Sequence, residues 1–594
     1  MYILGVSCFF HDSAAALLAD GELVAAAEEE RFTRKKHDFE FPVHAIDFCL
    51  RIAGIRGEDV ELAVFFEKPF LKFERILATA AATYPSSGGV FQKAMLTWLK
   101  DKLWIRSLLA DHLKIDTKKV VFSEHHVSHA ASSFYCSPFE DAAILTVDGV
   151  GEWTTASFGE GHGTDIKLRG EIRFPHSIGL LYSAFTAFLG FEVNEGEYKV
   201  MGMAPFGRPK FLDEVRKLYR LGDDGSFRLD MKYFSFHQSP TETYNDRFID
   251  LFGAARAPES YFFTKDSGYP SYFGDKPADF DRQAETNQHY ADVAASIQVA
   301  TEEILLHMAK HVRSSTGASR LCMAGGVALN SVANGRILRD AGFDEIFIQP
   351  AAGDGGGALG AALWGYHAVA GHPRKFRMTH AYWGEEHSDG VISDFLRAQS
   401  LKHQTFDDQD GLVGYVADQL QNGAVVGWMQ GRFELGPRAL GNRSILADPR
   451  RTDMKETVNT KIKFREPFRP FAPAVLAHRA KEYFEPKIAE QLPARFMLMV
   501  ADVAPAARSK IPAVTHVDGT GRIQTVYSDS NPLFFRLLSK FDSATGVPVL
   551  LNTSFNLRGE PIVNTPAEAL SSFSRSGMDL LVLGNSVIKK SDLC

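Results

Sequence analysis

Apolar and polar positions along the first 175 residues form one pattern twice. Apolar runs at 3–7, 14–18 and 23–27 predict three strands, and the Asp20–Gly21 pair predicts a tight turn between the last two. The same order follows at 142–147, 154–158 and 166–172, with a glycine-rich turn expected at 159–163. A strand order that returns in this way indicates an internal duplication.

Helical periodicity follows each copy. It predicts helices over 42–53, 90–113, 125–134, 178–189 and 282–314. Strands are then expected at 320–324 and 345–349, and a helix over 358–367. Between these elements, 194–207 is predicted to be a glycine-rich loop. Residues 208–280 are predicted to be an irregular insertion of the kind that covers a substrate.

Composition divides the chain further. With 594 residues, 45% of them apolar and 23% charged, the chain is expected to be globular and to have more than one core. A change of composition over 371–388 predicts a linker between domains 1–375 and 390–594. Within the second, helices are expected at 412–422 and 566–574, and strands at 424–428, 548–552 and 580–583. The predicted class is mixed α/β.

Several classes of protein are disfavoured. No apolar run reaches the roughly eighteen residues of a membrane span, and the first residues lack the basic region of a signal peptide. Five scattered cysteines without a CxxC pair favour a reducing, cytoplasmic compartment. The isoelectric point near 6.2 disfavours nucleic acid as a partner.

One basic stretch contrasts with the net charge of −8. Residues 431–473 hold ten Lys/Arg against five Asp/Glu, interleaved with glycine, proline and three phenylalanines. A solvated charged face does not need Phe464, Phe468 and Phe471 between its charges. The stretch is therefore predicted to form a rigid, half-buried loop that aims cations at one anion.

Two glycine-rich turns follow predicted strands, GGVALN at 325–330 and GDGGGALG at 353–360. Each can offer helix N-terminal amides to a phosphate, although glycine also serves tight αβ turns. Neither turn matches a P-loop or a clean dinucleotide fingerprint. The tandem of two favours nucleotide binding.

Candidate chemistry gathers where strands end. His125 and His129 lie four residues apart on one predicted helix face, and Asp148 and Asp354 follow strands. Together they make a candidate site for iron, manganese or zinc, with structural histidines as the alternative. His11 and Asp12 end the first strand, and His11 is a candidate base or acceptor-orienting group.

The second domain carries a further candidate set. Lys463 and Arg465 flank Phe464, Arg469 follows, and Ser554 and Asn556 alternate at a strand end. Such a Lys-x-Arg with a distant Ser-x-Asn can bracket a triphosphate.

The motifs FHDSAAAL, EEERF, HHVSHAASSFYCSPF, GRFELGPRALGNRSILADPR, KFREPFRPFAP and LNTSFN together resemble the O-carbamoyltransferases of the nodulation-protein and tobramycin carbamoyltransferase family. The resemblance covers essentially the whole chain. It implies an actin/Hsp70/sugar-kinase-like duplicated domain followed by a domain like threonylcarbamoyl-adenylate synthase.

The resemblance also implies roles for individual residues. Catalytic roles fall to His11, Asp12, Lys463 and Arg438. The set expected to bind carbamoyl phosphate and ATP is Arg438, Lys463, Arg465, Arg469, Arg522, Ser554 and Asn556. The set expected to contact carbamoyl adenylate is Lys36, Gly325, Gly326 and Asn330. An iron-type metal would be held by His125, His129, Asp148 and Asp354.

The implied activity is transfer of a carbamoyl group from carbamoyl phosphate, through ATP and carbamoyl adenylate, to a hydroxyl of a small molecule. Mg²⁺ would accompany the ATP, and Fe²⁺ or another divalent metal would sit in the first domain. A homodimer is one candidate assembly. Alternatives are a tRNA-directed threonylcarbamoyl transferase, which the acidic pI disfavours, and an actin-fold nucleotide sensor, which leaves the second domain unexplained.

Overall fold

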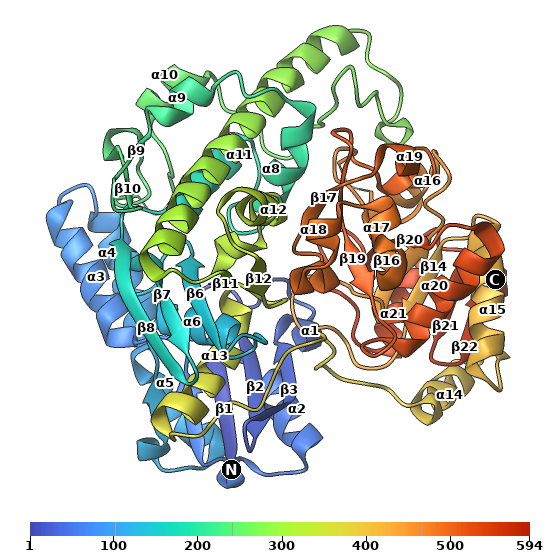
Figure 1. The fold of residues 1–594 in the computed structure, drawn as a ribbon, viewed down its shortest axis with the longest axis horizontal. Coiled ribbons are helices and arrows are strands. Elements are labelled where there is room, and N and C mark those ends of the chain that lie inside the picture. The colour runs from blue at the N-terminus through green and yellow to red at the C-terminus, as the bar shows by residue number, and fades with distance from the viewer. Residues whose placement is uncertain (101, 240, 465, 594) are drawn as a thin grey trace. The chain divides into compact units, whose positions relative to one another are not determined.

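The structure, a computed structural model, describes residues 1–100, 102–239, 241–464 and 466–593 (Figure 1). The chain folds into two compact units. Unit 1 comprises Met1–Glu29, His37–Thr264 and Asp281–Met378. Unit 2 comprises Glu30–Lys36, Lys265–Phe280 and Thr379–Cys594.

Unit 1 contains two five-stranded sheets with the same topology. The first has the order β3-β2-β1-β4-β5 and the second the order β8-β7-β6-β11-β12. In each, an antiparallel meander is followed by two strands parallel to its first strand. This repeat confirms the predicted duplication. The strands are β1 (Tyr2–Ser7), β2 (Ala14–Ala19), β3 (Glu22–Glu28), β4 (Leu62–Phe65), β5 (Val120–Phe122), β6 (Asp141–Val147), β7 (Thr154–His162), β8 (Asp165–Arg173), β11 (Arg320–Ala324) and β12 (Glu345–Ile348).

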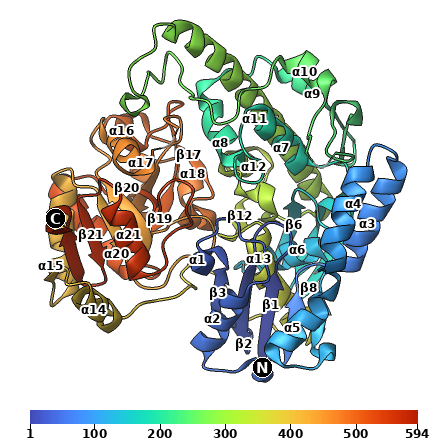
Figure 2. The ribbon, with the colours of Figure 1, turned by 180° about the vertical axis from the view of Figure 1, so that it is seen from behind.

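Two helices connect the sheets of unit 1. Helix α13 (Asp354–Trp364) packs on β1 and β2, helix α6 (His125–Phe134) packs on β6 and β11, and the two helices pack on each other (Figure 2). Glycines allow these close approaches. A Cβ on Gly5 would lie 1.9 Å from the carbonyl oxygen of Ala358, and one on Gly360 would lie 1.9 Å from that of Ser128. The helices therefore hold their first residues between the ends of both sheets.

The remaining helices of unit 1 mostly follow the predicted periodicity. They are α2 (Val43–Ala53), α3 (Pro69–Ala82), α4 (Gly88–Lys100), α5 (Ile105–Leu113), α7 (Ile178–Phe188), α8 (Glu197–Met203), α9 (Leu212–Arg216), α10 (Asp246–Phe252), α11 (Phe280–Thr316) and α12 (Ser331–Asp340). In 208–280 the structure has only short elements, among them the hairpin of β9 (Tyr219–Leu221) and β10 (Phe227–Leu229).

Two local predictions in unit 1 are wrong. The turn expected at 159–163 is absent there, because β7 continues to His162 and pairs with β8 as far as Asp165. Small glycines let the two strands lie close, since a Cβ on Gly159 would meet the carbonyl oxygen of Lys167 at 2.1 Å. The loop expected at 194–207 contains α8, whose buried face includes Val200 and Met203.

Unit 2 is built on one eight-stranded mixed sheet of order β13-β22-β21-β14-β15-β20-β16-β19. Its strands are β13 (Gln404–Thr405), β14 (Val426–Met429), β15 (Arg443–Ala447), β16 (Ala472–Leu476), β19 (Gln524–Val526), β20 (Val549–Ser554), β21 (Leu580–Leu583) and β22 (Ser586–Lys589). Helices α15 (Gln409–Gln421) and α20 (Pro532–Thr545) pack on each other and bury Trp428 with them in one apolar core. Unit 2 is α/β, as predicted.

The basic stretch is only in part the predicted loop. It contains β15, every residue of which is buried, the short helix α16 (Met454–Val458), and the start of β16. Alternating cations and apolar side chains hid these strands, because Arg443 is itself fully buried. The loops on either side of β15 remain irregular and glycine-rich.

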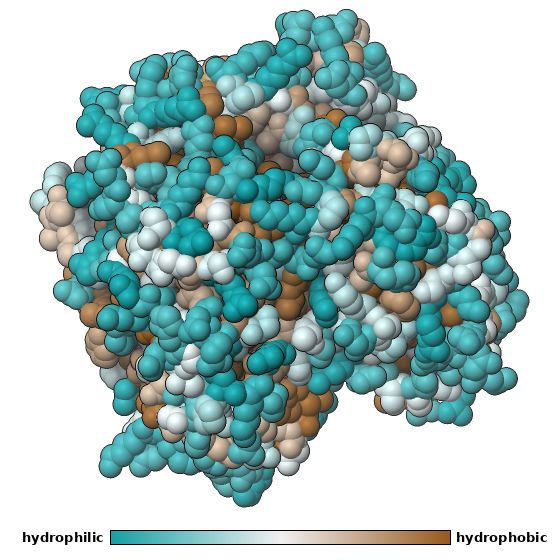
Figure 3. Space-filling view, in the orientation of Figure 1, coloured by the Kyte–Doolittle hydropathy of each residue, from teal (hydrophilic) through white to brown (hydrophobic). Residues whose placement is uncertain are grey.

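The surface and the thiols complete the description. Figure 3 shows hydrophilic residues over most of the visible face, with apolar residues in small groups among them. Within the described residues, no helix is both long enough and apolar enough to cross a membrane. Cys8, Cys49, Cys136 and Cys322 are buried free thiols.

Candidate functional site

Four buried side chains converge where α6, α13 and β6 meet. His125 and His129 lie one turn apart on α6, Asp148 directly follows β6, and Asp354 is the first residue of α13. His125 Nε2 lies 3.0 Å from His129 Nε2, 3.1 Å from Asp148 Oδ2 and 3.5 Å from Asp354 Oδ1. His129 Nε2 lies 3.7 Å from Asp148 Oδ2 and 3.5 Å from Asp354 Oδ1. One ligand atom from each residue thus faces a common centre.

These distances fit a metal ion. Ligand atoms about 2.0–2.2 Å from one ion, at tetrahedral or octahedral angles, lie roughly 2.8–3.6 Å from one another. Two Nε2 atoms 3.0 Å apart cannot both carry a proton toward each other. A divalent cation between them satisfies both imidazoles and both carboxylates. Mixed imidazole and carboxylate donors suit iron, manganese or zinc.

The charges around the cluster shift its titration strongly. Burial alone lowers the pKa of His125, but Asp354, Asp148 and Glu67 outweigh it and raise the pKa well above the usual value. For Asp148, burial raises the pKa, while His125 and His129 lower it well below the usual value. Neighbouring His126 instead stays neutral, because burial and the two adjacent histidines lower its pKa. The cluster therefore offers two ionised carboxylates to a cation.

The first predicted glycine turn lies against this cluster. Gly326 N donates to Asp148 Oδ1 at 2.8 Å, and Gly325 N donates to Ala352 O at 2.8 Å in the second glycine turn. Gly325 has φ +96°, and a Cβ there would lie 2.2 Å from the carbonyl oxygen of Val147. The Asn330 side chain caps α12 by accepting from Ala333 N and pairs with Gln298. Adenylate binding by Gly325, Gly326 and Asn330 stays a prediction.

His11 and Asp12 form a second polar group in unit 1. His11 Nδ1 lies 2.8 Å from Asp12 Oδ2, His11 Nε2 lies 3.0 Å from the carbonyl oxygen of Asn194, and His37 Nδ1 lies 2.9 Å from Asp12 Oδ1. Burial lowers the pKa of His11, but the hydrogen bond and charge of Asp12 raise it to about 10. Both ring nitrogens therefore donate, and His11 is an imidazolium. This arrangement favours the orienting role over the role of general base.

Lys36 belongs to a different unit from the one expected. The sequence placed it with the adenylate-binding residues of the first domain, whereas Glu30–Lys36 groups with unit 2. The segment is anchored there because Arg31 donates to Gly436 O at 2.6 Å and Arg34 donates to Ile562 O at 2.7 Å. A contact of Lys36 with adenylate stays a prediction.

In unit 2, Lys463 joins the two predicted residues at the end of β20. Its ammonium group is buried and donates to Ser554 O at 2.5 Å, Asn556 O at 2.9 Å and Asn556 Oδ1 at 2.8 Å. Ser554 Oγ donates to Asn556 Oδ1 at 2.7 Å. Three residues predicted from distant motifs are therefore one hydrogen-bonded group.

The other predicted cations of unit 2 occupy separate elements. Arg438 is half-buried in the loop before β15, Arg469 lies 3.5 Å from Glu466, and Arg522 ends β18 (Thr520–Arg522). That loop is tied to the sheet by Gln524, which donates to Leu440 O at 2.6 Å. Arg465 lies outside the described residues. Anion binding by these arginines stays a prediction.

Comparison with known proteins decides the family. The description "Carbamoyltransferase N-terminus" matches residues 2–363, and "Carbamoyltransferase C-terminus" matches residues 417–590. The chain belongs to the carbamoyltransferase family. The resemblance drawn from the sequence motifs is thereby confirmed, and the protein is a transferase.

Relatives cover this carbamoyltransferase almost completely. An uncharacterized protein of Synechocystis sp. is 46% identical over 99% of this chain and 97% of its own length. Nodulation protein NolNO of Sinorhizobium fredii is 38% identical over 98% of this chain and 79% of its own. The 3'-hydroxymethylcephem-O-carbamoyltransferase of Amycolatopsis lactamdurans is 31% identical over 55% of this chain and 60% of its own. The crystal structure of T. kodakarensis HypF aligns with a TM-score of 0.31 and 14% identity over 62% of this chain and 48% of that chain, too weak a similarity to argue from.

Several residues of this carbamoyltransferase site escaped the sequence prediction. Glu67 follows β4, His37 contacts Asp12, and buried Glu434 accepts the backbone N–H groups of Leu440, Asn442 and Arg443 through one oxygen. Four-residue β4 is too short to stand out as a strand. Its recognition would have marked Glu67 as a further strand-end carboxylate beside Asp148.

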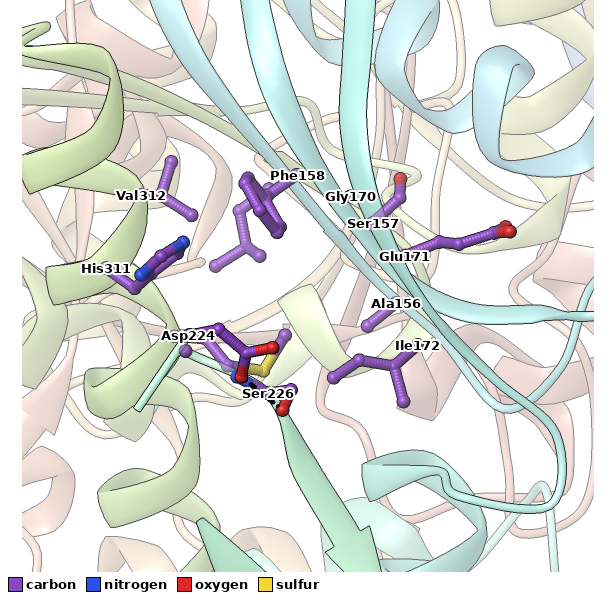
Figure 4. A pocket seen from close by; sticks show the side chains of 13 residues that line it. Ala156, Ser157, Phe158, Gly170, Glu171, Ile172, Asp224, Ser226, His311 and Val312 are labelled. Carbon is purple, nitrogen blue, oxygen red and sulfur yellow. Dashed lines mark hydrogen bonds between the residues drawn. The ribbon is translucent and has the colours of Figure 1, made fainter. Parts of the chain in front are cut away.

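A cavity of about 180 Å³ in the carbamoyltransferase lies away from these groups. It is enclosed by β7, β8, α11 and the β9–β10 turn (Figure 4). Phe158 and His311 meet edge to face at 5.1 Å on its wall. None of the site residues predicted from the sequence is among the described residues that line it. It therefore adds nothing to the candidate chemistry.

Proposed function

We propose that the protein is an O-carbamoyltransferase that uses carbamoyl phosphate and ATP to carbamoylate a hydroxyl of a small molecule. Family membership supports carbamoyl transfer. The cephem O-carbamoyltransferase among the relatives supports an oxygen acceptor on a small molecule. The observation that carries the proposal is that each unit contains one buried polar cluster, and the two clusters suit different halves of the chemistry.

The first half-reaction is assigned to unit 2. Water cleaves carbamoyl phosphate to carbamate and phosphate, and a carbamate oxygen then attacks the α-phosphorus of ATP. Pyrophosphate leaves, and carbamoyl adenylate remains. Lys463, held by Ser554 and Asn556, supplies a fixed cation, and Arg438, Arg469, Arg522 and Arg465 are the further groups that would neutralise phosphate oxygens. Mg²⁺ would accompany the ATP.

The second half-reaction is assigned to unit 1. The acceptor oxygen attacks the carbamoyl carbon, the C–O bond to the adenylate phosphate breaks, and AMP leaves while the hydroxyl loses its proton. His125, His129, Asp148 and Asp354 would hold Fe²⁺ or another divalent metal, which supplies Lewis acidity when bound. The His11 imidazolium, fixed by Asp12, would orient the reacting groups and stabilise developing negative charge.

The nucleotide products test this proposal. Incubation with ATP and carbamoyl phosphate is expected to give AMP and pyrophosphate, and pyrophosphate release is expected to depend on carbamoyl phosphate. Chromatography of the nucleotides separates AMP from ADP. ADP as the sole nucleotide product would overturn the adenylate route and favour a kinase.

A further inference from the structure

Glu67 is a buried carboxylate beside the metal cluster that the proposed chemistry does not use. It lies two residues beyond the end of β4 and is 3% exposed. Its Oε2 lies 3.5 Å from Nδ1 of His125, the ring nitrogen that faces away from the cluster. A shift of about half an ångström brings this ion contact to hydrogen-bonding distance. Glu67 is thus on the outer side of the ring whose inner nitrogen faces Asp148.

Glu67 is itself fixed and charged. Lys72 Nζ lies 2.6 Å from Glu67 Oε2, and Lys72 is 2% exposed, with its ammonium group 3.8 Å from the centre of the Phe10 ring. Burial raises the pKa of Glu67, but Lys72 and His125 lower it to about 2. Phe66 packs on the His125 ring at 5.2 Å and limits its movement. The pair of Lys72 and Glu67 is therefore a rigid acceptor for a ring N–H.

We propose that Glu67 is a positioning residue for the metal cluster, which takes the Nδ1–H of His125 and keeps Nε2 free of protons and directed at the metal. This inference rests on the proposed metal site. A histidine that binds a metal through one nitrogen must carry its proton on the other, and a carboxylate there fixes both tautomer and ring orientation.

Glu152 offers a matched comparison. It is also a buried carboxylate next to His125, but it accepts backbone N–H groups instead of a ring nitrogen. Its Oε1 accepts from Lys68 N at 2.8 Å and from His125 N at 3.0 Å. It thereby anchors the start of α6 without contacting the imidazole. Loss of its charge should affect folding and leave the preference of His125 for a tautomer unchanged.

The experiment is a titration of the metal-free full-length protein with Co²⁺, read by calorimetry and by the visible spectrum of bound cobalt. Glu67→Gln is expected to weaken Co²⁺ binding about 10- to 100-fold and to change the cobalt bands. Glu152→Gln is expected to lower the melting temperature and to keep the affinity within about twofold of wild type. Affinity of Glu67→Gln within twofold of wild type would overturn the inference.

Two further outcomes keep the test decisive. If circular dichroism shows that Glu67→Gln is unfolded, the double variant Glu67→Gln/Lys72→Met replaces it, because it removes both buried charges together and carries the same expectation. Wild-type protein that binds no Co²⁺, Fe²⁺ or Mn²⁺ would reject the metal site of the proposed function. Wild-type binding with an unaffected Glu67 variant rejects only the role of Glu67.

Discussion

At the scale of single residues, charge is concentrated where side chains are least exposed. Lys463, Arg443, Glu434 and Glu67 are buried, and each is held by several partners or by an opposite charge. An unpaired buried charge costs several kcal/mol, so such groups persist only within complete networks. Substitutions at these positions are therefore expected to separate functional from structural roles.

Lys463 gives the first residue-scale prediction. Lys463→Met is expected to slow pyrophosphate release about 30- to several thousand-fold, because losing a desolvated contact between a cation and phosphate costs roughly 2–5 kcal/mol. The control is Lys461→Met, since Lys461 is half exposed and lies 3.5 Å from Asp579. Pyrophosphate release is measured for both. A wild-type rate in Lys463→Met would show that this lysine only braces Ser554 and Asn556.

His11 gives a prediction about pH. Its pKa in the folded protein, about 10, lies above its ordinary value of 6.5, so its contribution to stability is fully present below about pH 6.5 and is lost as pH rises toward 10. The difference in unfolding free energy between wild type and His11→Gln is expected to shrink over that range. Chemical denaturation at several pH values measures it. A difference that stays constant from pH 6 to 10 would mean that His11 is neutral.

At the scale of elements, strand ends and helix starts bring the chemistry of unit 1 together. Strand β6 ends at Asp148, α13 begins at Asp354, and the turn at Gly325 and Gly326 lies between the two. Sequence patterns predicted these elements because their apolar runs are continuous and their glycines follow directly. They could not predict β4 or β15, since one is very short and the other contains a buried arginine.

Gly325→Ala tests the glycine turn. Its positive φ and the 2.2 Å approach of Val147 O predict a loss of more than about 2 kcal/mol in unfolding free energy, together with weaker metal binding as Gly326 moves from Asp148. Gly149→Ala is the control, because a Cβ there meets nothing within 4 Å. Thermal unfolding and metal content are compared. Equal stability of the two variants would show that the turn tolerates a side chain.

At the scale of the whole molecule, one chain contains two units with different chemistry. The duplicated strand pattern was predicted from the sequence, as were the four residues of the metal cluster and the grouping of Lys463 with Ser554 and Asn556 by motif. Membership of Glu30–Lys36 in unit 2 could not be predicted, because it depends on hydrogen bonds to residues several hundred positions away. Long-range anchoring of this kind leaves no local pattern.

The division of labour between the units is tested most directly by His129→Ala. Metal content by elemental analysis, pyrophosphate release and carbamoylated product by mass spectrometry are measured on the same preparation, with an acceptor chosen from a screen of hydroxylated metabolites. We predict loss of bound metal and of carbamoylated product, with pyrophosphate release close to wild type, because Lys463 and its partners are unchanged. Unchanged metal content together with unchanged product, or loss of both half-reactions in a folded protein, would contradict the assignment of the two chemistries to two separate sites.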